Sequence, residues 1–243
     1  MDICITGVSR GLGNTLCRVL LARGHRVWGI ARSESALRAL ESELQNDRFR
    51  ASVVDITDAT ALERWRAQME TEKFGCDVLV LNASIQLDDM GETFNAKNAK
   101  DVIDVNLTGT LATIGALFPA IQKSHGRIVA VTSTIALRPS VRSASYAASK
   151  AGLRMAMRSL RVTYRKSSMS FGDLCLGPVA TDMWEGKRSF LVPSAKTTAM
   201  AVAPFIESRR KNLYYPFLTT MLLRLSLWLP DSVFAAVSHR VLK

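Results

Sequence analysis

Residues 3–13 of this 243-residue chain read ICITGVSRGLG, a short apolar run followed at once by a turn with three glycines. Continuous apolar character over residues 3–5 indicates a strand that is covered on both faces of its sheet. Glycines let the next residues turn tightly and bring backbone N–H groups close to an anion. The stretch therefore predicts a strand, a phosphate-binding turn and the start of a helix.

Short apolar strands and helical stretches alternate along most of the chain. Alternation of this kind implies right-handed crossovers and a parallel sheet. We predict a single α/β domain, a doubly wound parallel sheet of the Rossmann type with about seven strands and helices on both faces. The predicted strands are residues 3–5, 26–30, 51–54, 78–81, 127–131, 170–174 and 213–216, and the predicted helices include residues 14–23, 35–45, 59–73 and 146–165.

The composition is that of an ordered globular protein, with 48% hydrophobic and 22% charged residues. It excludes disordered and low-complexity proteins. A formal net charge of +11 favours anionic partners, which include nucleic acids, acidic membranes and phosphorylated ligands. The sequence contains no recognition helix, zinc-ligand spacing or aromatic platform, so we expect no nucleic-acid partner.

The cysteines and the N-terminus bear on the cellular compartment. Four scattered cysteines (Cys4, Cys17, Cys76 and Cys175) predict buried, reduced thiols, and three dispersed histidines predict no metal site. Asp2 stands where a signal peptide would begin its charged and apolar segments. The longest apolar run, residues 213–229, is interrupted by Pro216 and Arg224 and is short for a membrane span. We therefore expect a cytoplasmic protein.

The glycine turn has the spacing T-G-x-x-x-G-x-G over residues 6–13, which resembles the short-chain dehydrogenase/reductase family. The resemblance continues with Asp55, which is expected to close the third strand, with NAS at residues 82–84 and with LGPVAT at residues 176–181. The family commonly has NAG where this chain has NAS. The resemblance implies a nicotinamide dinucleotide cofactor. The predicted cofactor-binding residues, which include Arg32 after the second strand, are Thr6, Gly7, Ser9, Arg10, Gly11, Leu12, Gly13, Arg32, Asp55, Ile56, Asn82, Ala83, Tyr146, Lys150, Gly177, Val179 and Thr181.

Two arginines favour NADP(H) over NAD(H). In Rossmann-type sites an acidic residue after the second strand binds the ribose of NAD, whereas arginine accommodates the additional phosphate of NADP. Here Arg32 follows the second strand, and Arg10 lies inside the glycine turn. Two guanidinium groups can hold a phosphate through charge-assisted, bidentate hydrogen bonds. The alternative for each arginine taken alone is a solvated turn residue.

Tyr146 and Lys150 lie four residues apart and therefore on one face of a predicted helix. A phenol has a pKa of about 10, and a neighbouring ammonium group is expected to lower it toward neutrality. Ser133 precedes Tyr146 by the spacing of the family, and Thr134 is a less well spaced substitute. The resemblance implies that Ser133 orients a substrate carbonyl and that Asn106 holds a helix irregularity and a water on a proton path to Lys150. A Tyr–Lys pair alone is also common on solvated helices.

These motifs predict an NADPH-dependent oxidoreductase that reduces a ketone or aldehyde to an alcohol, or catalyses the reverse reaction, with Tyr146 as the proton donor. The substrate is a small carbonyl or alcohol, and a 3-oxoacyl thioester is a close variant. The alternative from another class is a non-catalytic NADP(H) sensor. An intact Ser–Tyr–Lys set argues against a sensor, which has no use for a tuned phenol.

The resemblance is strong over residues 1–183, the predicted cofactor-binding and catalytic core. Residues 184–243 are expected to supply a substrate lid and an apolar C-terminal segment. That segment packs internally, packs on a partner subunit, or contacts a membrane through residues 209–229. On the helix 146–165, four arginines fall within roughly 60° of arc. They predict a salt-sensitive or altered oligomer, with a dimer slightly favoured, unless the face is solvated in a monomer (Arg154, Arg158, Arg161 and Arg165).

Overall fold

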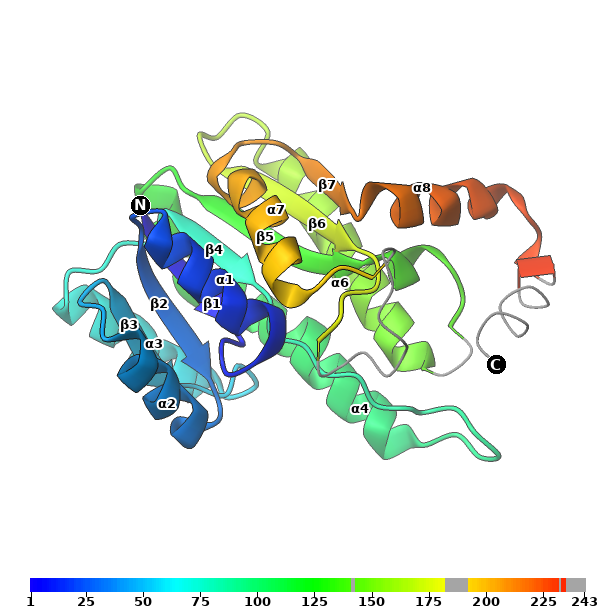
Figure 1. Ribbon diagram of the computed structural model, residues 1–243, viewed down its shortest axis with the longest axis horizontal. Helices are drawn as coiled ribbons and strands as arrows, with labels where there is room; N and C mark the ends of the chain where they lie inside the picture. Colours follow the sequence, from blue (N-terminus) through cyan, green and yellow to red (C-terminus); the bar gives the residue numbers. More distant parts are fainter. Residues whose placement is uncertain (141–142, 182–191, 232, 235–243) are drawn as a thin grey trace.

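A computed structural model of the protein describes residues 1–140, 143–181, 192–231 and 233–234. They form one sheet of seven parallel strands with helices on both faces (Figure 1). The strand order is β3-β2-β1-β4-β5-β6-β7, which is the predicted doubly wound arrangement. The strands are β1 (Asp2–Thr6), β2 (Arg26–Ala31), β3 (Phe49–Val53), β4 (Val78–Leu81), β5 (Arg127–Ser133), β6 (Ser170–Leu176) and β7 (Asn212–Tyr215).

Two helical layers cover the sheet because strand residues alternate between its faces. Residues such as Ile3 and Ile5 pack under α1 (Gly11–Ala22), α2 (Glu34–Leu44) and α7 (Ala195–Glu207). Residues such as Cys4 and Leu79 pack under α3 (Ala59–Thr71), α5 (Thr110–Lys123) and α6 (Ala144–Thr163). With both faces covered, the buried residues of the central strands β1 and β4 are almost entirely apolar, as the sequence predicts, whereas β3 at the sheet edge is partly polar and exposed. The remaining helical segments are α4 (Ala96–Ile103), η1 (Asp104–Gly109), η2 (Thr134–Leu137), α8 (Phe217–Leu225) and η3 (Ser226–Trp228).

The carboxyl ends of the strands meet at one edge of the sheet. Strand order reverses between β1 and β4, the place where open α/β sheets bind their ligands. The turn after β1, the residues after β4 and the ends of β5 and β6 all lie at this edge. The motifs that the sequence singles out are therefore brought together by the topology.

The segment Ala96–Lys123 is one continuous helix made of α4, the π-helical η1 and α5. By length and composition it is apolar enough to cross a membrane. Its apolar character has another cause here, because Leu117 and Ile121 are fully buried in the core on the α3 side of the sheet. Such a helix is therefore weak evidence for a membrane span.

The C-terminal quarter is divided between the core and the surface. β7 pairs with β6, and α7 packs beside α1, so both belong to the sheet and its helical layer. α8 extends away from the body of the molecule (Figure 1). The residues 209–211, which the sequence groups with the apolar segment, precede β7 and so lie at the opposite edge of the sheet from α8. Arg209 donates to the carbonyl oxygens of Ser168 and His125 there.

Candidate active site

The glycine turn after β1 is built by close backbone contacts. Gly7 has a φ of +76°, and a Cβ atom there would lie 2.7 Å from the Cα of Ala83. A Cβ on Gly13 would lie 2.2 Å from the carbonyl oxygen of Gly7. Gly11 also has a positive φ, of +60°. These positions exclude every residue with a side chain, so glycine is required by backbone conformation at Gly7 and Gly11 and by space at Gly7 and Gly13.

Thr6 and Asn82 hold the turn against the end of β4. The Oγ1 atom of Thr6 accepts hydrogen bonds from the backbone N–H groups of Asn82 and Ala83, at 3.0 and 2.9 Å. The Asn82 amide donates to the carbonyl oxygens of Thr6 and Gly7, both at 3.0 Å. Of the predicted cofactor residues, these two therefore have side chains engaged in shaping the cradle.

The residues at this edge fit a dinucleotide. α1 begins after Arg10 without a side-chain cap and has no acidic residue in its first turn, so its N–H groups and its positive dipole end face outward. Thr181 lies against Gly11, since a Cβ there would be 3.6 Å from the Thr181 Cβ. A pyrophosphate is the group that such a helix start accepts. The other predicted residues follow the same edge, with Ser9 and Leu12 in the turn and with Gly177 and Val179 after β6.

Arg32 and Asp55 are neighbours at the ends of β2 and β3. Arg32 Nη1 lies 4.0 Å from Asp55 Oδ2, and both side chains are partly exposed. Asp55 also accepts hydrogen bonds from the N–H and hydroxyl of Thr57. β3 ends at Val53, so Asp55 lies in the following turn and does not close the strand as predicted. Ile56 is buried beside it, while Arg10 is exposed.

Ser133, Tyr146 and Lys150 come together where β5 ends and α6 begins. Lys150 is 3% exposed, donates to the carbonyl oxygen of Val131 at 3.1 Å, and has its Nζ 5.7 Å from the centre of the Tyr146 ring. Burial lowers the pKa of Lys150 to about 8. Ser133 ends β5, where its Oγ accepts from the N–H of Ile135 and favours the ionised form of the Tyr146 phenol. Thr134, the weaker alternative, is buried.

The pKa of Tyr146 moves in the opposite direction to the expectation. Burial raises it, while the hydroxyl groups of Ser84 and Ser133 oppose the rise. The prediction considered the charge of Lys150 and neglected the loss of water around the phenol. Burial disfavours the charged phenolate, and this effect exceeds the stabilisation by the two hydroxyls.

Asn106 lies in η1, the π-helical turn between α4 and α5, and is fully buried. Its side chain pairs with both backbone groups of Ile85, accepting from the N–H and donating to the carbonyl oxygen, each at 2.8 Å. It also donates to Ser149 Oγ at 3.2 Å, one residue before Lys150. The helix irregularity that the resemblance implies is therefore present, and the amide joins the loop after β4 to α6.

Asp89 is a supporting residue that the sequence does not reveal. It is 1% exposed and accepts hydrogen bonds from the backbone N–H groups of Ala144 and Ser145, both at 2.8 Å. These are the first N–H groups of α6, which the Ser143 hydroxyl caps as well. Burial alone would raise the pKa of Asp89, and the hydrogen bonds from Ser145 and Ala144 outweigh it and lower that pKa. The partners lie more than fifty residues apart, so local patterns carry no signal for them.

A buried ion pair lies behind the catalytic strand. Arg154 Nε is 3.2 Å from Asp173 Oδ2, with the carboxylate fully buried and the guanidinium largely so. The Thr132 hydroxyl donates to the same carboxylate. The network thus ties α6 to β6 and to β5 beside Ser133. It also went unpredicted, because Arg154 looked like a surface residue.

The four arginines of α6 do not act as the single row of like charges from which the sequence analysis predicts an altered oligomer. Arg154 pairs with Asp173, and Arg161 donates to the carbonyl oxygen of Lys211 and to Asn212 Oδ1. The helical wheel ignores the reach of arginine, whose long side chain extends to the neighbouring strands β6 and β7. The salt-sensitive oligomer and the dimer stay predictions.

Other predictions can be placed only in part. All four cysteines are buried free thiols, as expected. Among the described residues, no group of three or more His, Cys, Asp or Glu side chains is arranged to hold a metal ion. The predicted lid lies partly outside the described residues, since these omit 182–191 and 235–243.

Comparison with known proteins identifies the family. Residues 2–191 match the family described as short chain dehydrogenase. This chain is a short-chain dehydrogenase. Members of this family are oxidoreductases, and the dehydrogenase is therefore an oxidoreductase enzyme. It is 32% identical to an uncharacterized oxidoreductase of Myxococcus xanthus, over 98% of this chain and 96% of the relative. It is 30% identical to the 3-oxoacyl-(acyl-carrier-protein) reductase FabG of Escherichia coli over 74% of this chain and 73% of the relative.

Solved structures show the same fold. A short chain dehydrogenase from Burkholderia cenocepacia in complex with NADP has a TM-score of 0.82 at 24% identity, covering 96% of the dehydrogenase and 95% of that chain. An alcohol dehydrogenase from Thermococcus sibiricus, complexed with 5-hydroxy-NADP, has a TM-score of 0.79 at 22% identity, covering 88% and 95%. The seven-stranded parallel sheet of the dehydrogenase is thus that of its structural relatives.

Proposed function

We propose that the dehydrogenase is an NADPH-dependent reductase of ketones or aldehydes, or the reverse alcohol dehydrogenase, with Tyr146 as the proton donor. The observation that carries the proposal is the cluster of half-buried Ser133 and Tyr146 with buried Lys150, in which the lysine Nζ lies 5.7 Å from the phenol ring. The cluster lies at the same edge of the sheet as the glycine turn. It therefore joins a proton donor to a dinucleotide cradle.

The roles follow from the chemistry of the side chains. A bound reduced nicotinamide supplies the hydride. Ser133 orients the substrate carbonyl by hydrogen bonding, and Tyr146 gives its proton to the oxygen as the alcohol forms. Protonated Lys150 stabilises the phenolate left behind, which offsets the effect of burial on the phenol. Asn106 positions α6 through Ser149.

NADPH is favoured by Arg10 and Arg32 at the edge where the adenosine ribose would lie. Arg32 follows β2 without an acidic residue at the strand end, and its side chain is 60% exposed, which leaves it available for a phosphate. The pairing with Asp55 at 4.0 Å is weak enough to yield to a doubly charged anion. Solved relatives in complex with NADP and 5-hydroxy-NADP are consistent with this choice.

Fluorescence titration with NADPH and NADH, followed by a panel of carbonyl substrates, tests the proposal. Arg32→Ala is expected to weaken NADPH binding about tenfold and to leave NADH binding unchanged. Arg38→Ala removes an exposed arginine of α2 and is the control. Equal affinities of the two cofactors for the wild-type enzyme would overturn the NADPH preference without affecting the reductase assignment.

Tyr146→Phe separates an enzyme from a sensor. In a reductase this substitution abolishes turnover and leaves cofactor affinity nearly unchanged. A protein that binds cofactor but reduces no carbonyl in the panel, with or without the substitution, would be a sensor.

A 3-oxoacyl thioester is the second candidate substrate, favoured by the 30% identity to the FabG reductase. The net charge of +11 suits an acidic carrier protein. We compare a 3-oxoacyl thioester with its free ketone analogue. A preference for the free ketone would exclude this variant.

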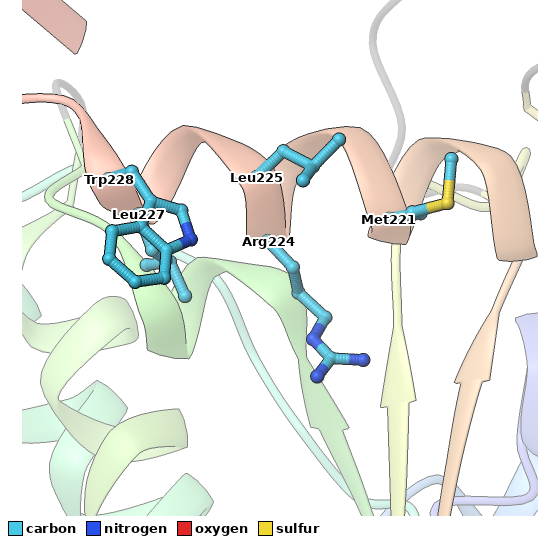
Figure 2. Close-up of a pocket in the computed structure, with 5 residues that line it drawn as sticks. All are labelled: Met221, Arg224, Leu225, Leu227 and Trp228. Carbon is cyan, nitrogen blue, oxygen red and sulfur yellow. The ribbon is translucent and has the colours of Figure 1, made fainter.

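We further propose that α8 contacts an anionic membrane surface. Its exposed face is apolar, with Leu222 54%, Leu225 58% and the following Trp228 89% exposed. Figure 2 shows Arg224 turned back toward the body, where its guanidinium lies 4.5 Å from the Tyr214 ring. Arg138 ties the end of this segment to η2 beside Ser133, by pairing with Asp231 at 2.8 Å. The apolar helix therefore adjoins the candidate active site.

A lipid surface suits this face better than a second subunit. α8 has nine residues and is only about 14 Å long. A stable dimer buries roughly 800 Å² on each partner. A short amphipathic helix is sufficient for interfacial binding, and the net positive charge favours anionic lipids. Because Arg209 lies at the other sheet edge, the contact rests on α8 and the overall charge.

Co-sedimentation of the full chain with anionic and neutral vesicles tests this contact. The triple variant Leu222→Gln/Leu225→Gln/Trp228→Gln is expected to reduce pelleting with anionic vesicles roughly tenfold. Met155→Gln/Val162→Gln removes exposed apolar side chains from α6 and is the control. Unchanged pelleting of the triple variant would exclude the contact.

A further inference from the structure

Ser84 stands between the cofactor cradle and the catalytic centre. The residue before it, Ala83, donates its N–H to Thr6 Oγ1 at 2.9 Å. The residue after it, Ile85, pairs both of its backbone groups with the Asn106 side chain. The backbone is thus held on both sides of Ser84, and the position of its side chain is determined by neighbours that also build the site.

The Ser84 hydroxyl is buried without a well-aligned hydrogen bond to any residue that the structure describes. Removing a hydroxyl from water without a partner destabilises the folded state. The fold does not require this hydroxyl, because the family pattern that residues 82–84 resemble commonly has glycine, which has no side chain, at the position of Ser84. A buried polar atom kept at a cost to stability, next to reacting groups, indicates a role in the reaction.

The Ser84 hydroxyl acts on the phenol of Tyr146. Ser84 and Ser133 both favour the ionised form of this phenol and so oppose the rise in its pKa on burial. The two serines approach from different strands, since Ser133 ends β5 and Ser84 follows β4. Ser133 Oγ accepts a hydrogen bond from the N–H of Ile135, whereas the Ser84 hydroxyl makes no such bond among the described residues.

We propose that Ser84 is a positioning residue for Tyr146, whose O–H donates to the phenolate oxygen and stabilises it when the proton leaves. The proposal rests on the proposed function, because it assumes that Tyr146 exchanges a proton with the substrate. The phenolate is the product of carbonyl reduction and the base in alcohol oxidation. Ser84 therefore supports both directions, and alcohol oxidation near neutral pH depends on it most.

The test compares Ser84→Ala and Ser84→Gly with a matched control. Thr198 in α7 also has a buried hydroxyl without a partner among the described residues, and Thr198→Val removes it away from the centre. We measure the pH profile of kcat/KM for alcohol oxidation, the affinity for NADPH and the Tm. Ser84→Ala is expected to raise the apparent pKa of the profile by about one unit and to lower kcat near neutral pH about tenfold, without lowering the Tm. Ser84→Gly removes the hydroxyl without leaving the methyl group of alanine, so it shows whether that methyl group contributes to the effect.

A direct titration of the phenol keeps this proposal separate from the substrate assignment. The ultraviolet difference between wild type and Tyr146→Phe reports the ionisation of Tyr146 and needs no turnover. The same difference measured in the Ser84→Ala background is expected to titrate at a higher pH. An unchanged titration, or an equal change with Thr198→Val, would overturn the role of Ser84. If the titration shifts but no carbonyl is reduced, the proposed reductase function fails while the contact stands.

Discussion

The glycine turn and the candidate catalytic centre lie at one edge of the sheet but are held together in different ways. In the turn, backbones approach so closely that a Cβ on Gly13 would be 2.2 Å from the oxygen of Gly7. In the centre, buried polar groups such as Asp89 and Asp173 depend on partners from other elements. The turn therefore requires residues without side chains, and the centre requires that each buried polar group has a hydrogen-bond or ion-pair partner. The first is disrupted by adding a group, and the second by removing one.

Gly13→Ala is expected to have the largest effect, because the new methyl group meets backbone that has no room to move. We expect a loss of about 5 kcal/mol in the free energy of unfolding, measured by urea denaturation, and little soluble protein. Gly115→Ala in α5 is the control, since no described atom lies within 4 Å of its added Cβ. The control is expected to gain up to about 1 kcal/mol. Equal stability of the two variants would remove the steric half of the comparison.

Asp173→Asn tests the dependence on pairing. It leaves the Arg154 guanidinium largely buried beside a neutral amide, so we expect a loss of about 3 kcal/mol in the free energy of unfolding. Adding Arg154→Met removes the unpaired charge and is expected to restore part of the loss. A double-mutant cycle measures the coupling, and strictly additive effects would show that the pair is not a unit.

Lys150→Met separates stability from activity in the centre. The folded pKa of Lys150, about 8, lies below the ordinary value of 10.5, so burying its charge destabilises the protein near pH 7. We expect the variant to be about 2 kcal/mol more stable than wild type near neutral pH, and inactive. Between these two pKa values the unfolded chain binds more protons, so wild-type stability rises with pH and the difference closes. Denaturation at neutral and alkaline pH measures it, and a constant difference would contradict the cause.

Asp89→Asn is expected to have the smallest effect on stability, a loss of about 1 kcal/mol from the start of α6. The lowered pKa of Asp89 means that its contribution is present at neutral pH and is lost as the pH falls below the ordinary carboxyl range. Asp58→Asn makes the same change at the N-cap of α3 and is the control. Thermal melts are expected to show similar losses, but only Asp89→Asn is expected to lower kcat. Equal kcat values would limit Asp89 to a structural role.

The comparison also explains what sequence reasoning could reach. Strands and the glycine turn are local patterns, and the catalytic set has a short, regular spacing, so both could be recognised from the order of residues. Asp89 and Asp173 act through contacts that span tens of residues, and no spacing rule connects such partners. Arg154 was misassigned to the surface for the same reason.

Electrostatic expectations failed where burial decides the outcome. The effect of Lys150 on Tyr146 follows from their spacing, but desolvation of the phenol depends on everything packed around it. Ser84 was recognised only as a departure from a family pattern. Its hydroxyl gains meaning once its burial and its neighbours are known.

The π-helical turn η1 changes which residues of helix 96–123 share one face of the helix. A π-helical turn takes in about one residue more than an α-turn, so α4 and α5 do not continue a single 3.6-residue period across Asp104–Gly109. A single-residue deletion there would restore ideal winding and rotate the Asn106 amide away from Ile85. The number of residues in the Asp104–Gly109 turn is therefore constrained, as well as their identity.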